Sequence, residues 1–163
     1  MAWANSKIFR ITLANALGNV TPLDLDADSF KLANYNNSIT PDQNVAATTA
    51  AYNTGQWATA NEVSQAGQWA AGGIAIGSTV LDTSTNGIVM FDGADVASGS
   101  AATLSNVFGG LVYDDTLASG VNGAPVTDQG LCYLYYGGAA SVTNGTLTVQ
   151  FAATGICRFD LTV

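Results

Sequence analysis

Apolar and polar positions alternate in short runs along most of the chain, and glycine, asparagine, aspartate and serine separate the runs. Runs of this kind predict strands over residues 74–81, 87–92, 103–113 and 130–136, with another from Leu23 to Tyr35. The final pair, 146–151 and 156–163, flanks a turn at Ala153-Thr154-Gly155 and predicts a β-hairpin with one apolar face. Short strands at this spacing indicate a mainly β fold, an antiparallel β-sandwich or jelly-roll-like single domain over residues 1–163.

Two segments depart from this alternation. Residues 1–22 form an N-terminal arm in which Ile8, Phe9, Leu13 and Leu17 have helical spacing, although residues 8–12 could also extend. The spacing favours a short helix over 6–17, with Ser6 as its N-cap and Gly18 at its end. Residues 36–73 lose all periodicity and predict a long loop excursion, with a helical turn near 45–52.

Aromatic residues make an ordered loop the better interpretation of this excursion, because disordered segments usually lack them. Tyr52, Trp57 and Trp69 lie within it. Exposed aromatic side chains in loops are enriched at protein interfaces, so these three are the candidate partner interface. Two alternatives stay open: the rings stack on a glycan, or the loop folds back and the indoles cap the end of the sandwich.

The composition describes an unusually neutral surface. Apolar residues make up 48% of the 163-residue chain and charged residues only 10%, well below the share of about 25% in ordinary globular proteins. Few long side chains must be ordered and few ions desolvated when a partner binds such a surface. This composition favours burial in a permanent assembly, although a merely low-charge globular domain has it too.

The few charges are mostly negative, and this excludes some classes of binding partner. The net charge is −8, and the only basic residues are Lys7, Arg10, Lys31 and Arg158. Binding of nucleic acid or of an anionic membrane is therefore not expected, because both rely on clustered Lys and Arg. With neither a signal peptide nor an apolar run of about 18 residues, the chain is expected to be made in the cytoplasm as a soluble protein.

Candidate chemistry is sparse. Histidine is absent, which excludes Ser-His-Asp and Cys-His sites. Asp92, Asp95, Asp114 and Asp115 could supply the two carboxylates of a hydrolase, but each follows a predicted strand, where aspartate favours turns. We therefore expect no enzyme, no catalytic residue and no cofactor.

A metal site is not expected either. Alternate carboxylates at Asp24, Asp26 and Asp28 could bind Ca²⁺, yet the EF-hand pattern fails, since its twelfth position is Tyr35. Cys132 and Cys157 fit neither a disulfide framework nor a zinc site. They are expected to be buried thiols on the core faces of neighbouring strands, and a disulfide formed after assembly stays open.

Several segments carry a family pattern that spans most of the chain from Leu23 onward. They are DSFKLA (28–33), SITPD (38–42), GQW (55–57), NEV (61–63), AAGG (70–73), LVYDDT (111–116) and SVTNGTLTVQ (141–150). In this order they resemble a family of small virion proteins of tailed bacteriophages. Where relatives carry an Arg before a Gly-Ala-Leu-Ile-Tyr stretch, this chain has FGGLVY (108–113), so no role of that Arg can be carried over.

The resemblance implies a structural protein rather than an enzyme. Members are described as capsid decoration, cement or minor capsid proteins, and some as tail components. The expected partner is the major capsid protein, with the chain on the capsid exterior and a trimer by analogy. A tail or baseplate component and a carbohydrate-binding module are the alternatives.

Overall fold

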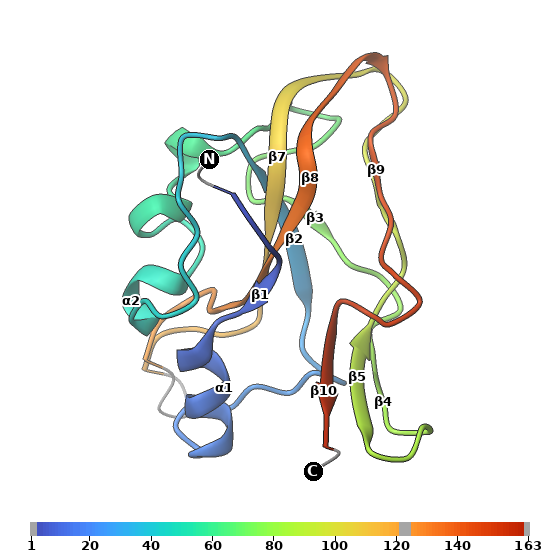
Figure 1. Cartoon of the computed structure of the whole chain (residues 1–163). Helices are drawn as coiled ribbons and strands as arrows, with labels where there is room; N and C mark the ends of the chain where they lie inside the picture. The colour runs from blue at the N-terminus through green and yellow to red at the C-terminus, as the bar shows by residue number, and fades with distance from the viewer. Residues whose placement is uncertain (1–2, 121–124, 162–163) are drawn as a thin grey trace.

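A five-stranded antiparallel sheet forms the centre of the molecule in the computed structural model, which describes residues 3–120 and 125–161 (Figure 1). Its strand order is β1 (Lys7–Ile8), β8 (Gly130–Gly145), β7 (Ala102–Asp114), β2 (Phe30–Tyr35) and β3 (Ile74–Ala75). A three-stranded sheet has the order β10 (Cys157–Asp160), β5 (Ile88–Asp92) and β4 (Val80–Asp82), and β6 (Val96–Ala97) pairs with β9 (Thr148–Val149). The structure is 39% strand and 12% helix, so the prediction of a mainly β fold is confirmed.

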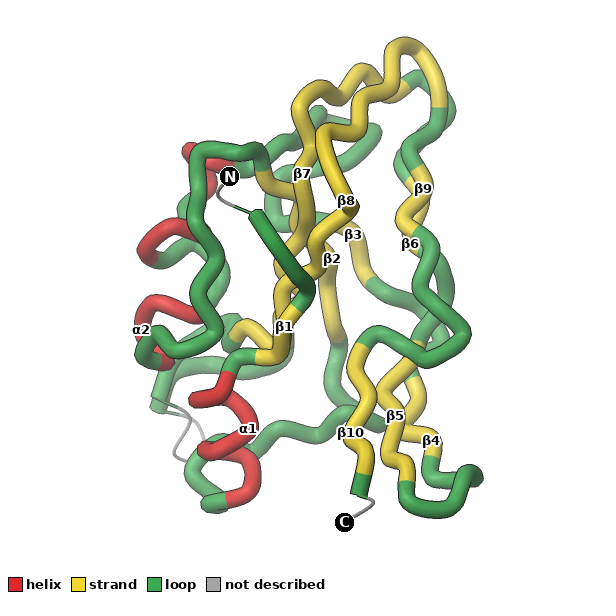
Figure 2. Tube along the Cα trace, in the orientation of Figure 1, coloured by secondary structure: helices red, strands yellow, loops and turns green. Residues whose placement is uncertain are grey.

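One long antiparallel ribbon connects these sheets. β5 pairs with β10, β6 with β9 and β7 with β8, so that residues 88–114 run alongside residues 130–160. The ribbon folds over at the top of the view in Figure 2, within β7 and β8. Register shifts in the β7–β8 pairing allow this bend, since bulges increase strand curvature. The fold brings the two small sheets against one face of the central sheet.

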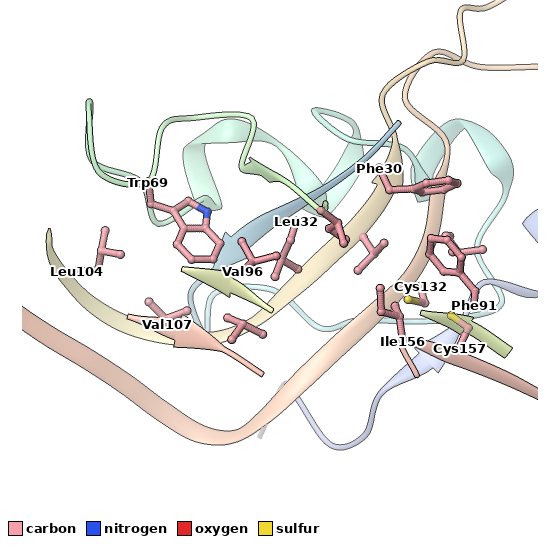
Figure 3. Close-up of a cluster of buried hydrophobic side chains, with 14 of the residues drawn as sticks. Phe30, Leu32, Trp69, Phe91, Val96, Leu104, Val107, Cys132, Ile156 and Cys157 are labelled. Carbon is pink, nitrogen blue, oxygen red and sulfur yellow. The ribbon is translucent and has the colours of Figure 1, made fainter. Parts of the chain in front are cut away.

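The main hydrophobic core lies between these layers. Phe30 and Leu32 of β2 contact it from the central sheet, and Phe91 of β5 contacts it from the three-stranded sheet (Figure 3). The ring centroids of Phe30 and Phe91 are 4.8 Å apart. This two-layer packing is the sandwich that the strand pattern predicts.

A second core covers the opposite face of the central sheet. There the excursion forms α2 (Ala47–Ala50) and two 3-10 turns, η1 (Gly55–Trp57) and η2 (Thr59–Asn61), which confirms the predicted helical turn near 45–52. Trp57 packs against Trp3 with ring centroids 5.9 Å apart. Trp3 lies directly on β7 at Gly109, where an added Cβ would come within 2.4 Å of the indole ring. The central sheet is therefore buried on both faces.

The N-terminal arm is part strand and part helix. Residues 7–8 extend as β1, and α1 spans Arg10–Leu17, so the helix predicted over 6–17 begins later than expected. Phe9, not Ser6, occupies the N-cap position; the Ser6 hydroxyl instead accepts a hydrogen bond from the Tyr135 amide at 3.0 Å. Gly18 ends the helix as expected, and its amide donates to the Ala14 carbonyl at 2.9 Å.

Three strand predictions need correction. The turn at 153–155 exists, since the Gly155 amide donates to the Ala152 carbonyl, but β9 and β10 on its two sides do not pair with each other. The strand predicted over 74–81 is divided between β3 and β4, which belong to different sheets. The strand predicted from Leu23 begins only at Phe30, because Asp24 and Asp28 bind backbone amides and hold residues 24–28 in a turn.

Candidate functional site

A groove of about 940 Å³ lies between α1, residues 22–25 and the three-stranded sheet. We call it the apolar groove. Its lining consists of Ile8, Thr12, Leu13, Ala16, Leu17, Pro22, Leu23, Asp24, Leu25, Leu81, Val89, Leu131, Phe159, Asp160 and Leu161. All of these except Thr12, Asp24 and Asp160 are apolar. A groove of this size and lining is suited to bind an apolar segment or ligand.

The groove exists because α1 turns its leucines outward. The only buried residue of the helix is Thr12, whose hydroxyl donates to the Gly130 carbonyl at 2.6 Å and accepts from the Gln129 side-chain amide at 3.1 Å. These buried hydrogen bonds fix the rotation of the helix about its axis. Leu13 and Leu17, one helical turn apart, consequently lie on the side that borders the groove.

Two leucines at the groove remain strongly exposed. Leu17 is 81% exposed and Leu161 is 64% exposed, and Leu13, which also lines the groove, is partly exposed. Full burial of a leucine side chain contributes about 1.5–3 kcal/mol. A partner that covered both side chains would therefore gain several kcal/mol from them.

Charge at the groove is confined to its border. Asp24 and Asp160 are the two carboxylates there, and Asp160 pairs with Arg158 at 3.0 Å. Asp26 lies close by and accepts a weak hydrogen bond from the Leu81 amide at 3.5 Å. The border is therefore net acidic, which suits a partner segment that carries a Lys or Arg beside its apolar residues.

The residues predicted as an exposed interface lie elsewhere, and two of them are buried. Trp57 and Trp69 are both 0% exposed, Trp57 in the second core and Trp69 in the main core. The placement of their indoles at a surface is therefore wrong. The loop folds back as in the alternative, but the indoles fill the two cores and do not cap the end of the sandwich. The reason is that burying two indoles outweighs the loss of loop entropy. A glycan-stacking platform built on these two rings is lost for the same reason.

Tyr52, the third predicted interface residue, is half-buried in a polar network. Its ring stacks on Tyr113 with centroids 4.8 Å apart, and its hydroxyl donates to Glu62 at 3.0 Å. Glu62 also accepts from the Gly72 amide at 2.9 Å, and Tyr113 donates to the Gly72 carbonyl at 2.6 Å. Burial raises the pKa of Glu62, while these donors oppose the rise. The network ties the middle and the C-terminal end of the excursion to β7.

Most of the carboxylates considered for catalysis or metal binding serve as backbone acceptors, and Asp115 instead pairs with Lys31. Asp114 accepts from the Thr116 and Leu117 amides, and Asp95 accepts from the Phe151 amide. Asp24 accepts from the amides of Asp26 and Ala27. Within residues 3–120 and 125–161, no group of three or more Cys, Asp or Glu side chains has a metal-binding arrangement.

The two cysteines are buried and free, as the sequence predicts. They do not lie on paired strands, however, since Cys132 is in β8 of the central sheet and Cys157 is in β10 of the three-stranded sheet.

Comparisons of the chain with protein-family models, curated proteins and solved structures find no match. The resemblance to phage virion proteins therefore stays an expectation. Across the part of the chain that the structure describes, no helix has the length and apolar character needed to span a bilayer.

The sequence contains the apolar side chains of the groove, but it does not show that they stay uncovered. Leu13 and Leu17 have the spacing of a buried helix face, and Leu161 alternates with Phe159 as a core position would. Periodicity identifies which side chains share a face and not what covers that face. The hydrogen bonds of Thr12 to residues 129–130 determine which side of the helix is buried. Those residues lie far along the chain, so no local pattern reveals the contact.

Proposed function

We propose that the chain is a structural protein of a tailed-phage virion, a capsid decoration or cement protein that binds the outer surface of the capsid. The observation that supports a binding role is the apolar groove, where Leu17 and Leu161 stay exposed on a folded chain. Water-exposed apolar surface of this extent commonly marks a site that a partner covers. The virion setting rests on the family resemblance of the sequence segments.

The composition of the chain supports a permanent rather than a transient contact. Only 10% of its residues are charged, so a docked partner displaces little tightly held water and orders few long side chains. Obligate interfaces are more apolar than transient ones for this reason. The groove supplies the apolar centre of such an interface.

The occupant that fits the groove is an apolar segment of the major capsid protein. Its apolar side chains would cover Leu13, Leu17 and Leu161, and a Lys or Arg beside them would meet Asp24 or Asp160 at the border. Complementary charge of this kind sets the orientation of the segment more than its affinity.

The net charge of −8 favours the outer face of the capsid. A chain inside the shell would be repelled by the phosphates of packaged DNA, whereas an outer position has no such cost. Binding to the assembled shell, and not to free subunits, would stabilise the shell by mass action at every occupied position. A trimer at threefold positions is the expected arrangement by analogy.

A reconstitution experiment tests the proposal. Particles of the phage that encodes the chain, made without the gene, are incubated with purified protein and sedimented, and the bound protein is quantified. Wild-type protein should co-sediment at a fixed ratio to the major capsid protein. Leu17→Asp and Leu161→Asp should each reduce binding by at least about tenfold, because each places a charge in an apolar contact.

Controls come from exposed valines outside the groove. Val20 and Val80 are 48% and 44% exposed and do not line it, so Val20→Asp and Val80→Asp should bind as the wild type does. Equal binding by the groove variants and these controls contradicts a role of the groove. Gold-labelled protein found on tails rather than heads overturns the capsid assignment and favours the tail alternative.

A further inference from the structure

Cys132 and Cys157 face each other across the main core. Cys132 belongs to β8 of the central sheet and Cys157 to β10 of the three-stranded sheet, and their side chains lie near each other in Figure 3. The two side chains are 2% and 4% exposed. A hydrogen bond between the thiols, together with burial, raises the pKa of Cys132 well above its usual value. The pair therefore joins two layers that no backbone pairing links at this point.

A cleft leads from solvent to this pair. It has a volume of about 340 Å³ and lies where β1, the edge strand of the central sheet, approaches β10, the edge strand of the three-stranded sheet. Both cysteines line it, and Lys7 and Arg158 stand at its sides. The cleft is large enough for the sulfur end of a small reagent. The thiols are thus buried from bulk water but reachable from one direction.

We propose that Cys132 and Cys157 are a modification site, where a small dissolved disulfide converts the two thiols into an intramolecular disulfide that links the two sheets. In a reducing medium the pair stays as two thiols, as in this structure. In an oxidising medium the bond forms between strands of facing sheets, as the inter-sheet disulfide of antibody domains does.

The reaction proceeds in two exchange steps. Cys157 loses its proton and its sulfur attacks one sulfur of the small disulfide, forming a mixed disulfide and releasing one small thiolate, which takes up a proton. Cys132 then loses its proton and its sulfur attacks the Cys157 sulfur, which releases the second small thiol. Two protein thiols are oxidised, and one small disulfide is reduced to two thiols. The second step is intramolecular, because both cysteines line the same cleft.

Forming this disulfide would hold together the side of the sandwich where the edge strands β1 and β10 approach each other. β10 continues into Phe159, Asp160 and Leu161, which form one wall of the apolar groove, and Ile8 borders both the cleft and the groove. The disulfide would hold that wall at a constant distance from β8. This inference does not depend on the proposed function, since it rests on the two thiols and the cleft alone.

The test treats reduced protein with excess 2-hydroxyethyl disulfide and counts free thiols in denaturant at successive times. We expect both thiols to disappear together, a product mass lower by two hydrogens with no attached mercaptoethanol, and a single intramolecular link in the peptide map. The melting temperature should rise by about 5–10 °C, since the link constrains the unfolded chain.

Single variants provide the controls. Cys132→Ala and Cys157→Ala each keep one thiol, so they should form only the mixed disulfide and show no such rise in melting temperature. A wild-type protein that retains two free thiols after long treatment, or that accumulates stable mixed disulfides, overturns the proposal. So does a purely intermolecular link, which gel filtration of the treated protein would reveal.

Discussion

Among single residues, Asp114 is a carboxylic acid whose ionisation is strongly opposed by its surroundings. It is 0% exposed at the end of β7, and its Oδ1 accepts from the Thr116 and Leu117 amides, while Oδ2 has no donor among the described residues. Burial raises the pKa of Asp114 to about 7 from an ordinary value of 3.8, and the neighbouring Asp28 carboxyl opposes its ionisation further. The folded protein therefore holds a proton that the unfolded chain releases.

This proton predicts how stability depends on pH. Because the pKa of Asp114 is higher in the folded protein, its favourable contribution is complete below about pH 4 and is lost as the pH rises through about 7. We expect the free energy of unfolding to fall by on the order of a few kcal/mol between pH 5 and pH 8. Urea unfolding at a series of pH values measures this change.

Asp114→Asn should flatten the pH profile, because the amide keeps an acceptor for the Thr116 and Leu117 amides and no longer ionises. Asp115→Asn is the matched control, since Asp115 is an adjacent carboxylate that pairs with Lys31 at 2.8 Å near the surface. An unchanged slope in the Asp114 variant, or an equal change in both variants, would show that another group carries the proton.

Trp57 carries a second prediction at this scale. Its indole is fully buried and its ring contacts those of Trp3, Phe9 and Tyr35. Trp57→Ala should destabilise the fold by about 3–5 kcal/mol, as loss of a buried aromatic side chain does. Chemical denaturation checks this, with Tyr52→Phe as a control that removes only one hydroxyl. A stable Trp57→Ala protein would contradict the packing described here.

Among the secondary-structure elements, α1 depends most on a single polar contact. Thr12 joins it to the start of β8 through Gly130 and Gln129, while the leucines of the helix face the groove. Burial of apolar surface usually holds a helix on its sheet. Here the buried hydrogen bonds of Thr12 hold the helix on the sheet in part, and the side of α1 with Leu13 and Leu17 stays uncovered.

Thr12→Val tests this attachment, because valine keeps the shape of the side chain and removes its hydroxyl. We expect a loss of about 1–3 kcal/mol, since the Gln129 amide and the Gly130 carbonyl lose a buried partner. Thr12→Ser retains the hydroxyl and should be milder. Hydrogen exchange should show faster opening of residues 10–17 in the valine variant alone; equal protection in both variants would mean that apolar contacts hold the helix.

The local sequence pattern locates several strands but does not show which strands pair with one another. The strands near 88–92, 102–114 and 130–136 follow from short apolar runs that are bounded by turn-forming residues. The pairing of β10 with β5 does not follow from local pattern, because the two strands lie far apart in sequence. The tight turn at 153–155 instead predicts that residues 156–163 pair with the preceding strand. The alternation at 23–29 misleads because Asp24 and Asp28 satisfy backbone amides locally, which ends the strand pattern early.

At the scale of the whole molecule, the folded ribbon explains why one side stays open. The sheets approach each other at β1 and β10, both edge strands, and no described strand pairs across them. Both the cleft at the cysteines and the apolar groove lie along this side. The site could not be located from the sequence, because it arises where two edges meet and not within any one element.

An open apolar side should bind an apolar dye without any protein partner, which gives a last prediction. Nile red is neutral, so the acidic border should not exclude it, and its fluorescence should rise on addition of native protein because the groove shields it from water. Leu17→Asp and Leu161→Asp should lower this rise several-fold at unchanged melting temperature, whereas Val20→Asp and Val80→Asp, outside the groove, should preserve it. Dye binding that is equal in all four variants would place the apolar surface elsewhere on the molecule.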